Sequence, residues 1–394
     1  MNKQSKIAIC TGLVLASGSA LSATKVADAR GNGMGNTGVA SASYLVAPFY
    51  NPALTAMYEQ NHRVGVLLPA VEASIQDKDD TLDMVDELQD LMDVYSDDLT
   101  TDTSISGLSS DLDRLNDYLD KLDDNKLTAS AGAGIAVAIP NSMVSANIFT
   151  GGHVEVVAEA EVATLGSSTD TATYAQATQT RVENSDVDLY AFGYYEFGVA
   201  FAKQMQLMQQ NFSFGISPKY QKLRTYSQAD LGVNNFDIDD YDESEVNESA
   251  FNLDLGAVWF KDAWRVGAAV KDVFKQDIAT KEGNKTYELK PQVTVAGSYA
   301  TELFTAAVDV DLTKQTRFTG IEDDTQFIRF GVEGNAWNWA QLRLGYEVDT
   351  QDTLEDAITA GIGLSPFNVL HLDIAGSYAD ENQYGASANL ALMF

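Results

Sequence analysis

The stretch FTAAVDVDLT, residues 304–313, decides the fold, because its side chains alternate between an apolar and a more polar series. Val308 and Val310 fall on one side of the stretch, whereas Asp309 and Asp311 fall on the other. A period of two places successive side chains on opposite faces of a β-strand. The same alternation recurs to the C-terminus in segments of about ten residues separated by turn residues. The chain is therefore predicted to be an all-β protein.

We count fourteen alternating segments in the sequence. An even number is what a closed antiparallel barrel needs when both chain ends lie on the same side of a membrane. The predicted strands are 62–76, 127–139, 142–165, 185–203, 211–227, 250–260, 264–278, 287–300, 303–313, 326–336, 340–348, 356–365, 368–379 and 384–394.

A soluble sandwich would show the same alternation with its apolar face inward, but three features favour a transmembrane barrel. Many segments are long enough for a tilted membrane crossing. Trp259, Trp264, Trp337 and Trp339 lie beside short turns, as in an aromatic girdle at a membrane interface. Short turns also interleave with longer polar loops, the arrangement of outer-membrane barrels. These polar loops are expected at 167–183, 229–249, 280–286, 314–324 and 349–355.

The N-terminus has the three parts of an export signal. Lys3 and Lys6 precede an apolar run over 7–15, and small residues then lead to Ala23. We expect residues 1–23 to be a signal peptide cleaved after Ala23, which would also remove Cys10. The predicted location is the outer membrane of a Gram-negative bacterium.

The composition excludes several classes of function. The 394 residues include 25 Lys or Arg and 57 Asp or Glu, so the formal net charge is −32. That charge excludes a nucleic-acid-binding protein that relies on a basic surface. Cys10 is the only cysteine, and His62, His153 and His371 are the only histidines, so the sequence predicts no metal site. Because no Gly-x-Ser-x-Gly motif is present, it predicts neither an enzyme nor a cofactor.

Residues 24–61 do not alternate and are rich in glycine and alanine. Their glycines fit the spacing of a dinucleotide-binding loop, but no buried strand precedes them, so this reading fails. Glycines also allow a backbone to pack tightly in a confined lumen. We therefore expect 24–61 to be a hatch inside the barrel of residues 62–394. The candidate hatch motif comprises Gly33, Gly35, Gly38, Asn51, Pro52 and Ala53.

Residues 79–126 change to a helical period. The apolar residues with spacings of three and four are Val85, Leu88, Met92 and Tyr95 in one series and Leu108, Leu112, Leu115, Leu119 and Leu122 in the other. They predict two amphipathic helices that pair as a hairpin outside the cell, inserted after the first strand. Residues 77–124 contain 17 acidic and 3 basic residues. The hairpin is either a solvated charged surface or a cap that binds partners or gates the barrel.

Several charged residues belong to the polar series of their strands and are expected to face the lumen. Mixed signs on adjacent strands predict a salt-bridged wall that holds the hatch, although a contribution to a substrate path stays open. The candidate lumen-wall residues are Asp309, Asp311, Arg329, Glu333, Arg343, Glu347 and Asp373; the same pattern also includes Asp254, Lys271 and His371. Phe394 ends the last alternating strand and is a candidate signal for the barrel assembly machinery.

Four stretches carry a resemblance to known families. ARGNGMGNTGVA at 29–40 and APFYNPA at 47–53 resemble the hatch of the FadL-like outer-membrane superfamily, which includes long-chain fatty-acid and aromatic-hydrocarbon channels. The acidic helical insert and GISPKYQ at 215–221 resemble the barrel family labelled conjugal transfer protein TraF. The FadL resemblance implies fourteen strands around a hatch, with Asn51, Pro52 and Ala53 matching the Asn-Pro-Ala motif. It also implies a bound hydrophobic ligand that leaves through a strand kink or by hatch movement.

Two functions follow as hypotheses. The first is a passive channel for small hydrophobic molecules. The second is a structural or interaction barrel tied to conjugation or protein export, with the acidic hairpin as its contact. The expected partners are outer-membrane lipid and lipopolysaccharide, the barrel assembly machinery, and either a small hydrophobic ligand or other envelope proteins; no nucleic-acid partner is expected.

Overall fold

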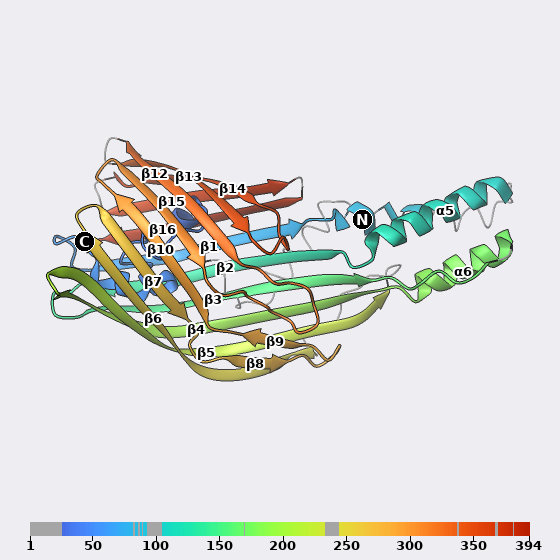
Figure 1. The fold of residues 1–394 in the computed structure, drawn as a ribbon, viewed down its shortest axis with the longest axis horizontal. Helices are drawn as coiled ribbons and strands as arrows, with labels where there is room; N and C mark the ends of the chain where they lie inside the picture. Colours follow the sequence, from blue (N-terminus) through green and yellow to red (C-terminus); the bar gives the residue numbers. More distant parts are fainter. Residues whose placement is uncertain are drawn as a thin grey trace.

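A computed structural model describes residues 26–394, apart from 82, 86, 89, 93–104, 169, 233–243, 337–338, 367–368 and 381. The predicted signal peptide, with Cys10 and the Ala23 cleavage site, lies outside these residues. The described chain forms a closed barrel of fourteen antiparallel strands (Figure 1). β1 pairs with β16, and Phe394 donates its backbone N–H to the carbonyl of Val64 at 2.9 Å. The predicted fourteen-stranded barrel is confirmed.

Strand lengths differ widely around the barrel. β4 and β5 have 22 and 23 residues, whereas β7 and β11 have 8 each. The barrel strands are β1 (Gly65–Asp77), β2 (Lys126–Ile139), β3 (Ser145–Glu161), β4 (Asp186–Leu207), β5 (Gln210–Gly232), β6 (Val246–Lys261), β7 (Trp264–Lys271), β10 (Gln292–Ala300), β11 (Phe304–Asp311), β12 (Phe327–Ala336), β13 (Ala340–Asp349), β14 (Ala357–Leu364), β15 (Leu370–Asp380) and β16 (Gln383–Met393).

The alternation in the sequence separates the inside of the barrel from the outside. On β12, Phe330 and Val332 are exposed, whereas Arg329 and Glu333 are buried. The other strands also present apolar side chains outward, among them Ile135, Val137, Ile148, Phe197, Phe201, Ile216, Leu342, Leu344, Ile362 and Ile374. An apolar outer surface around a polar interior is the pattern of transmembrane barrels. Within the described residues, no helix combines the length and apolar character needed to cross a bilayer.

Two predicted strands, 264–278 and 287–300, are wrong as continuous elements. Asp272 has a φ of 51°, which turns the chain out of the extended conformation, and Pro291 has no N–H to continue a ladder. The intervening residues form a separate two-stranded sheet of β8 (Gln276–Ala279) and β9 (Thr286–Leu289).

The prediction of a polar loop at 167–183 is also wrong, because α6 (Thr171–Glu183) fills most of it. Asp170 caps this helix by accepting a hydrogen bond from the backbone N–H of Thr173 at 2.9 Å, which lowers the pKa of its carboxyl. The helix was missed because the sequence TATYAQATQTRVE carries no pronounced apolar stripe.

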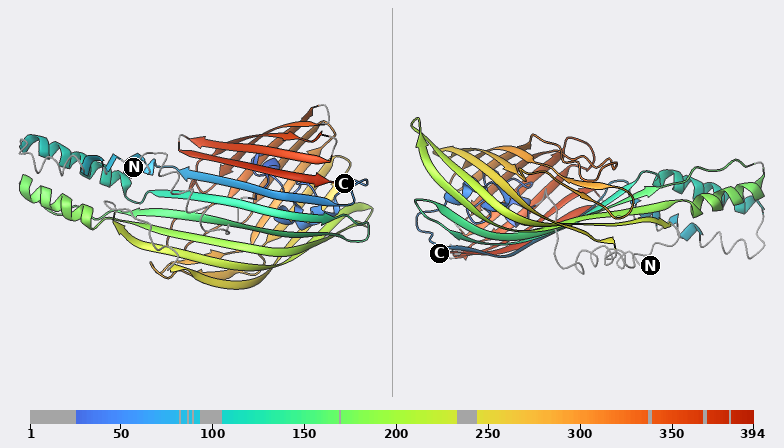
Figure 2. Two further views of the ribbon diagram at one scale, coloured as in Figure 1. Left: turned by 180° about the vertical axis from the view of Figure 1, so that it is seen from behind. Right: turned by 90° about the horizontal axis from the view of Figure 1, so that it is seen from below.

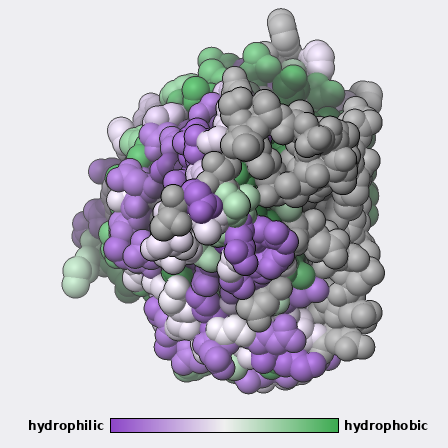
Figure 3. Space-filling model, turned by 90° about the vertical axis from the view of Figure 1, so that its right-hand side faces the viewer, coloured by the Kyte–Doolittle hydropathy of each residue, from purple (hydrophilic) through white to green (hydrophobic). Residues whose placement is uncertain are grey.

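α6 lies beside α5 (Ile105–Leu122) at one end of the molecule, beyond the barrel (Figures 1 and 2). Helical backbone also occurs at 83–85, 87–88 and 90–92. Leu88 and Leu91 from this segment belong to the same apolar cluster as Leu115 and Leu119 of α5. Tyr95 and the side chain of Leu108, which the prediction of a hairpin also used, lie outside the described residues. Hydrophilic residues gather over the described part of this end (Figure 3).

A buried polar group ties the two helices together. Arg181 of α6 donates to the side chain of Asn116 of α5 at 3.0 Å and to the carbonyl of Ala163 at 2.8 Å. The Asn116 amide donates in turn to the hydroxyl of Thr178 at 2.7 Å. Both Arg181 and Asn116 are buried, so the loss of one would leave polar groups unsatisfied.

We expect Arg181→Leu to loosen α6 and to leave the barrel intact. The loss of charge-assisted hydrogen bonds should cost about 2 kcal/mol of local stability, or about thirtyfold faster amide exchange in α6. Hydrogen–deuterium exchange measured by mass spectrometry checks this. Arg114→Leu is the matched control, because Arg114 lies on α5 with its side chain 59% exposed. Equal exchange in the two variants would contradict the assigned role of Arg181.

Candidate functional site

The N-terminal segment lies inside the barrel and fills much of its lumen (Figure 2). It contains α2 (Ala29–Asn32), α3 (Ala47–Tyr50) and a short 3₁₀ helix, η1 (Pro52–Ala56). α2 lies against β14, β15 and β16, whereas η1 lies against β3, β4, β5 and β6. We call residues 26–61 the hatch. Because the hatch contacts opposite sides of the wall, it crosses the lumen near the end with the short turns.

The hatch glycines allow its backbone to approach the wall closely. Gly35 has a φ of 65°, a conformation that strains other residues, and a side chain there would lie 2.6 Å from the carbonyl oxygen of Phe330. A methyl group on Gly345 of β13 would clash with Gly35 itself, and one on Gly33 would lie 3.0 Å from Gly361 of β14. Glycines of the hatch therefore meet glycines of the wall. Gly38 instead packs against the ring of Tyr50 within the hatch.

Asn51, Pro52 and Ala53 also lie against wall glycines. The Asn51 amide donates to the carbonyl of Val39 at 2.9 Å and accepts from the N–H of Ala53 at 3.0 Å. Asn51 fits against Gly256 of β6, where a methyl group would clash with its carbonyl oxygen. Pro52 and Ala53 similarly cover Gly215 of β5. The motif thus fixes the turn between α3 and η1 and seats it on two strands.

One group of ion pairs joins the hatch to β12, β13 and β15. Arg30 makes two hydrogen bonds to Glu333, each 2.9 Å long. Glu333 also accepts from Arg343 at 2.7 Å, and Arg343 donates to Asp373 at 2.6 Å. Asn389 links this chain back to the hatch, because it donates to Asp373 at 3.1 Å and accepts from the N–H of Ala29 at 2.8 Å.

A second group holds the turn that follows α2. Arg329 donates to Asp311 and Glu347, each at 2.9 Å, and Glu347 accepts from Asn36 of the hatch at 3.0 Å. One Asp309 oxygen accepts from the N–H groups of Gly38 and Val39 at 2.8 and 2.9 Å. All seven candidate lumen-wall residues are buried in these two groups. Asp309, Glu333 and Glu347 contact the hatch directly, whereas the others position them.

The structure contains a third ionic group, which was not predicted from the sequence. Lys219 of β5 lies 3.2 Å from Glu196 of β4, 3.0 Å from Asp254 of β6 and 2.9 Å from Asp272. Lys219 belongs to the GISPKYQ motif, and its charge within the predicted strand 211–227 was the available signal. Its partners come from separate segments, so only the register of the strands brings them together.

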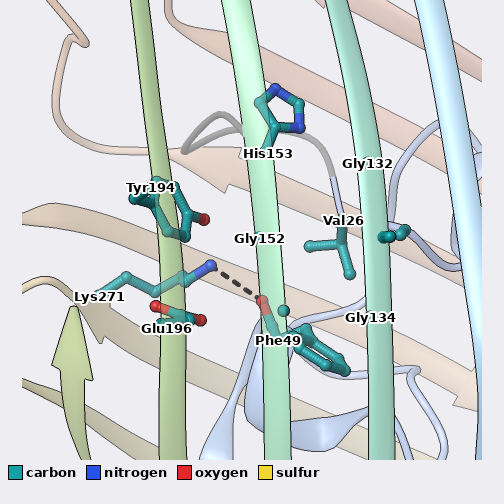
Figure 4. A pocket seen from close by; sticks show the side chains of 12 residues that line it. Val26, Phe49, Gly132, Gly134, Gly152, His153, Tyr194, Glu196 and Lys271 are labelled. Carbon is teal, nitrogen blue, oxygen red and sulfur yellow. Dashed lines mark hydrogen bonds between the residues drawn. The ribbon is translucent and has the colours of Figure 1, made fainter. Parts of the chain in front are cut away.

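A cavity lies directly above the hatch, on the side that faces the helical end. It encloses about 380 Å³, including solvent-open space. Phe49 and Val26 of the hatch form its floor, and His153 of β3 and Tyr194 of β4 line its wall (Figure 4). Lys271 of β7 reaches the carbonyl of Phe49 at 3.0 Å.

Aromatic side chains occupy the lumenal face of β3 and β4. Tyr190, Phe192 and Tyr194 follow one another at every second position of β4, and Phe149 of β3 lies closer to the short turns. Phe149 meets Phe49 of the hatch edge to face at 5.5 Å between ring centroids. We call Tyr190, Phe192, Tyr194 and Phe149 the aromatic strip. The lumen therefore has an ionic side on β11–β15 and, on β3 and β4, an aromatic strip that alternates with charged groups such as Glu155 and Glu196.

The closed barrel, the internal hatch and the apolar outer surface define a hatch-plugged barrel of the FadL-like fold. A FadL homologue from Pseudomonas aeruginosa superimposes with a TM-score of 0.55 at 10% identity, covering 95% of this chain and 99% of that chain. The toluene transporter TbuX of Ralstonia pickettii gives 0.53 at 12% identity, with 92% and 97% covered. The monoaromatic hydrocarbon channel CymD gives 0.51 at 11% identity, with 95% and 99% covered. At these identities the likeness shows the fold.

The family follows from the sequence itself. The model for the family described as "F plasmid transfer operon, TraF, protein" matches residues 48–311. The chain belongs to this TraF family, and the resemblance drawn from the acidic insert and residues 215–221 is confirmed. No curated protein matches the chain significantly.

We expect Gly331→Ala to displace the hatch, because the new methyl group would lie 2.6 Å from the Cβ of Met34. Overpacking of this kind should cost about 2 kcal/mol. The temperature at which the folded barrel unfolds in detergent should fall, and hatch residues should become accessible to protease. Gly334→Ala on the same strand is the control, since a methyl group there meets nothing within 4 Å. If the two variants behave alike, Gly331 does not seat the hatch.

Proposed function

We propose that the protein is an outer-membrane channel for small hydrophobic molecules and that the hatch keeps it closed. The aromatic strip is the observation that carries this proposal, because it supplies an apolar surface through a lumen whose opposite side is ionic. Transfer of apolar surface from water to such a strip is favourable by about 25 cal/mol per Å². The structurally similar proteins include a toluene transporter and a monoaromatic hydrocarbon channel, which supports the same function.

The strip defines a direction of travel. A molecule entering from the helical end would pass Tyr190 and Phe192, reach the cavity at Tyr194, and meet Phe49 on Phe149. Each step offers a ring for contact. Between Tyr194 and Phe149 the molecule would also pass Glu196 and Lys271, which line the cavity.

The hatch contacts suggest which edge opens. Toward β12–β15 it is held by the two arginine groups, whereas its edge at Phe49 is held by ring packing and by hydrogen bonds from Lys271 and Asn147. Ring contacts slide more readily than buried ion pairs break. The hatch edge at Phe49 is therefore proposed to move while the ionic side stays attached.

An irregularity in β1 offers an exit beside this edge. The pairing of β1 with β2 and with β16 shifts register just after Leu67, next to Pro69. Proline lacks the N–H that a ladder needs, so the pairing is interrupted there. Leu67 and Phe49 belong to one apolar cluster, and passage between β1 and its neighbours would lead into the membrane.

We expect a disulfide between Leu45→Cys and Asn147→Cys to close the channel. The Asn147 amide donates to the carbonyl of Leu45 at 2.7 Å, so the two residues are neighbours near the Phe49 edge. Entry of N-phenyl-1-naphthylamine into intact Gram-negative cells should be faster with the wild type than with an empty vector. The oxidised double variant should fall to the vector rate and recover when a reductant is added.

The single variant Asn147→Cys is the control, because it loses the same hydrogen bond and forms no link. A wild-type rate equal to the vector rate would overturn the channel. Normal entry through the oxidised double variant would instead show that this edge of the hatch does not move.

A second function is favoured by membership of the TraF family and by the acidic helical end. We propose as the alternative that this end contacts another envelope protein during conjugation or export. Exposed carboxylates at Asp90, Asp117 and Asp124 give it a surface that suits a basic partner.

The triple change of Asp90, Asp117 and Asp124 to asparagine should lower plasmid transfer frequency if this end is a contact in conjugation. The control changes Glu59, Asp262 and Glu302 to neutral amides, which removes the same charge near the short turns. Mating assays with cells of equal barrel content measure the difference. Transfer at the wild-type frequency in the first variant would count against conjugation as the role of this surface.

A further inference from the structure

A second internal structure covers the aromatic strip from the side of the long loops. It consists of the β8–β9 sheet with its flanking residues and of the segment 312–326, and we call it the cap. The two parts join where the N–H of Glu288 donates to the carbonyl of Arg317 at 2.8 Å. The cap also touches β5, because the hydroxyl of Thr225 donates to the carbonyl of Ala279 at 2.8 Å.

One side chain of the cap lies flat against the strip. The ring of Tyr287 is stacked on Phe192 with 3.5 Å between centroids and 7° between planes. Phe318, also of the cap, meets Tyr287 edge to face at 5.1 Å and contacts Tyr190 at 5.7 Å. Tyr287, Phe192 and Tyr190 are all buried. A planar ring is thus held on one face by the wall and at its edge by a second ring.

The hydroxyl of the same residue has a specific acceptor. Tyr287 donates to one oxygen of Glu155 of β3 at 3.0 Å, and Arg317 donates to the other oxygen at 3.1 Å. Burial, followed by the charge of Glu155, raises the pKa of Tyr287 well above its usual value, so the hydroxyl keeps its proton. The wall therefore recognises a planar ring and a hydroxyl donor at its far end.

These features describe a phenol held by the wall, except that the phenol is tethered to the cap. We propose that Tyr287 occupies a binding site for phenolic molecules, and that such a molecule replaces it when the β8–β9 sheet swings away from the strip. This inference rests on the proposed channel and names the class of molecule that its outer half selects. Phe192 supplies the stacking surface, and Glu155 supplies the acceptor.

Glu155 makes the site selective. Once Tyr287 leaves, an entering hydrocarbon would leave a buried carboxylate oxygen without its hydrogen bond, whereas a phenol would restore that bond. The difference between a phenol and the matching hydrocarbon should be about tenfold or more in affinity. Arg317, on the segment 312–326, keeps its ion pair with Glu155 while the β8–β9 sheet moves.

The test uses the full-length mature protein in nanodiscs, with p-cresol and toluene as probes and equilibrium dialysis as the measurement. We expect p-cresol to bind about tenfold more tightly than toluene, and Phe192→Leu to weaken p-cresol binding. A disulfide between Ser227→Cys and Glu282→Cys would lock the cap, because the N–H of Glu282 already donates to the Ser227 hydroxyl at 2.9 Å. The oxidised lock should lose p-cresol binding, and reduction should restore it.

Ser227→Cys alone is the control for the lock. Equal binding of p-cresol and toluene, or undiminished p-cresol binding to the oxidised lock, would overturn the proposal. Failure of the channel proposal would be detected by a different measurement, the entry of N-phenyl-1-naphthylamine into cells. If p-cresol binds and the lock prevents it, but the dye does not enter, the phenol site is supported and the channel is rejected. If the dye enters but p-cresol does not bind, the channel is supported and the phenol site is rejected.

Discussion

The carboxylate of Glu333, shared between Arg30 of the hatch and Arg343 of the wall, is the interaction on which the rest of the closed structure depends. Glu333 is buried, so it depends on its two arginine partners, and Arg343 is in turn shared with Asp373. Removal of one member from a buried ionic group costs about 3–5 kcal/mol, because the remaining charges stay behind without a partner. The hatch is thereby fixed at one side with a defined orientation, and its opposite edge is left to weaker contacts.

The two sides of the lumen hold the internal segments through different kinds of contact. Ion pairs need fixed geometry, so the wall of β11–β15 holds its hatch residues in one arrangement. Aromatic contacts tolerate sliding and exchange of one ring for another. The two parts that we propose to move, the hatch edge at Phe49 and the cap at Tyr287, meet the wall through rings on the same two strands. The proposed movements therefore lie along the proposed path of an apolar molecule.

The sequence was sufficient for the barrel because a period of two in side-chain polarity states directly which face of each strand is outside. It was insufficient where local chemistry overrides that period. Asp272 and Pro291 break two alternating segments into the β8–β9 sheet, and α6 forms from a capped helix without an apolar stripe. The charge of Lys219 was visible, but its three carboxylates come from distant segments and meet only through strand register. The same holds for Tyr287 and Glu155, which are 132 positions apart.

The unequal strands give the barrel a slanted rim. A tilted membrane crossing needs about 9–11 residues. All of β7, with 8 residues, would therefore lie within the bilayer. β5 has 23 residues and would continue for about the same length again beyond it. The barrel wall therefore extends further from the membrane at β4 and β5 than at β7. This taller flank includes β4, and with it the upper rings of the strip. Molecules approaching from this side would meet the long strands of this flank first.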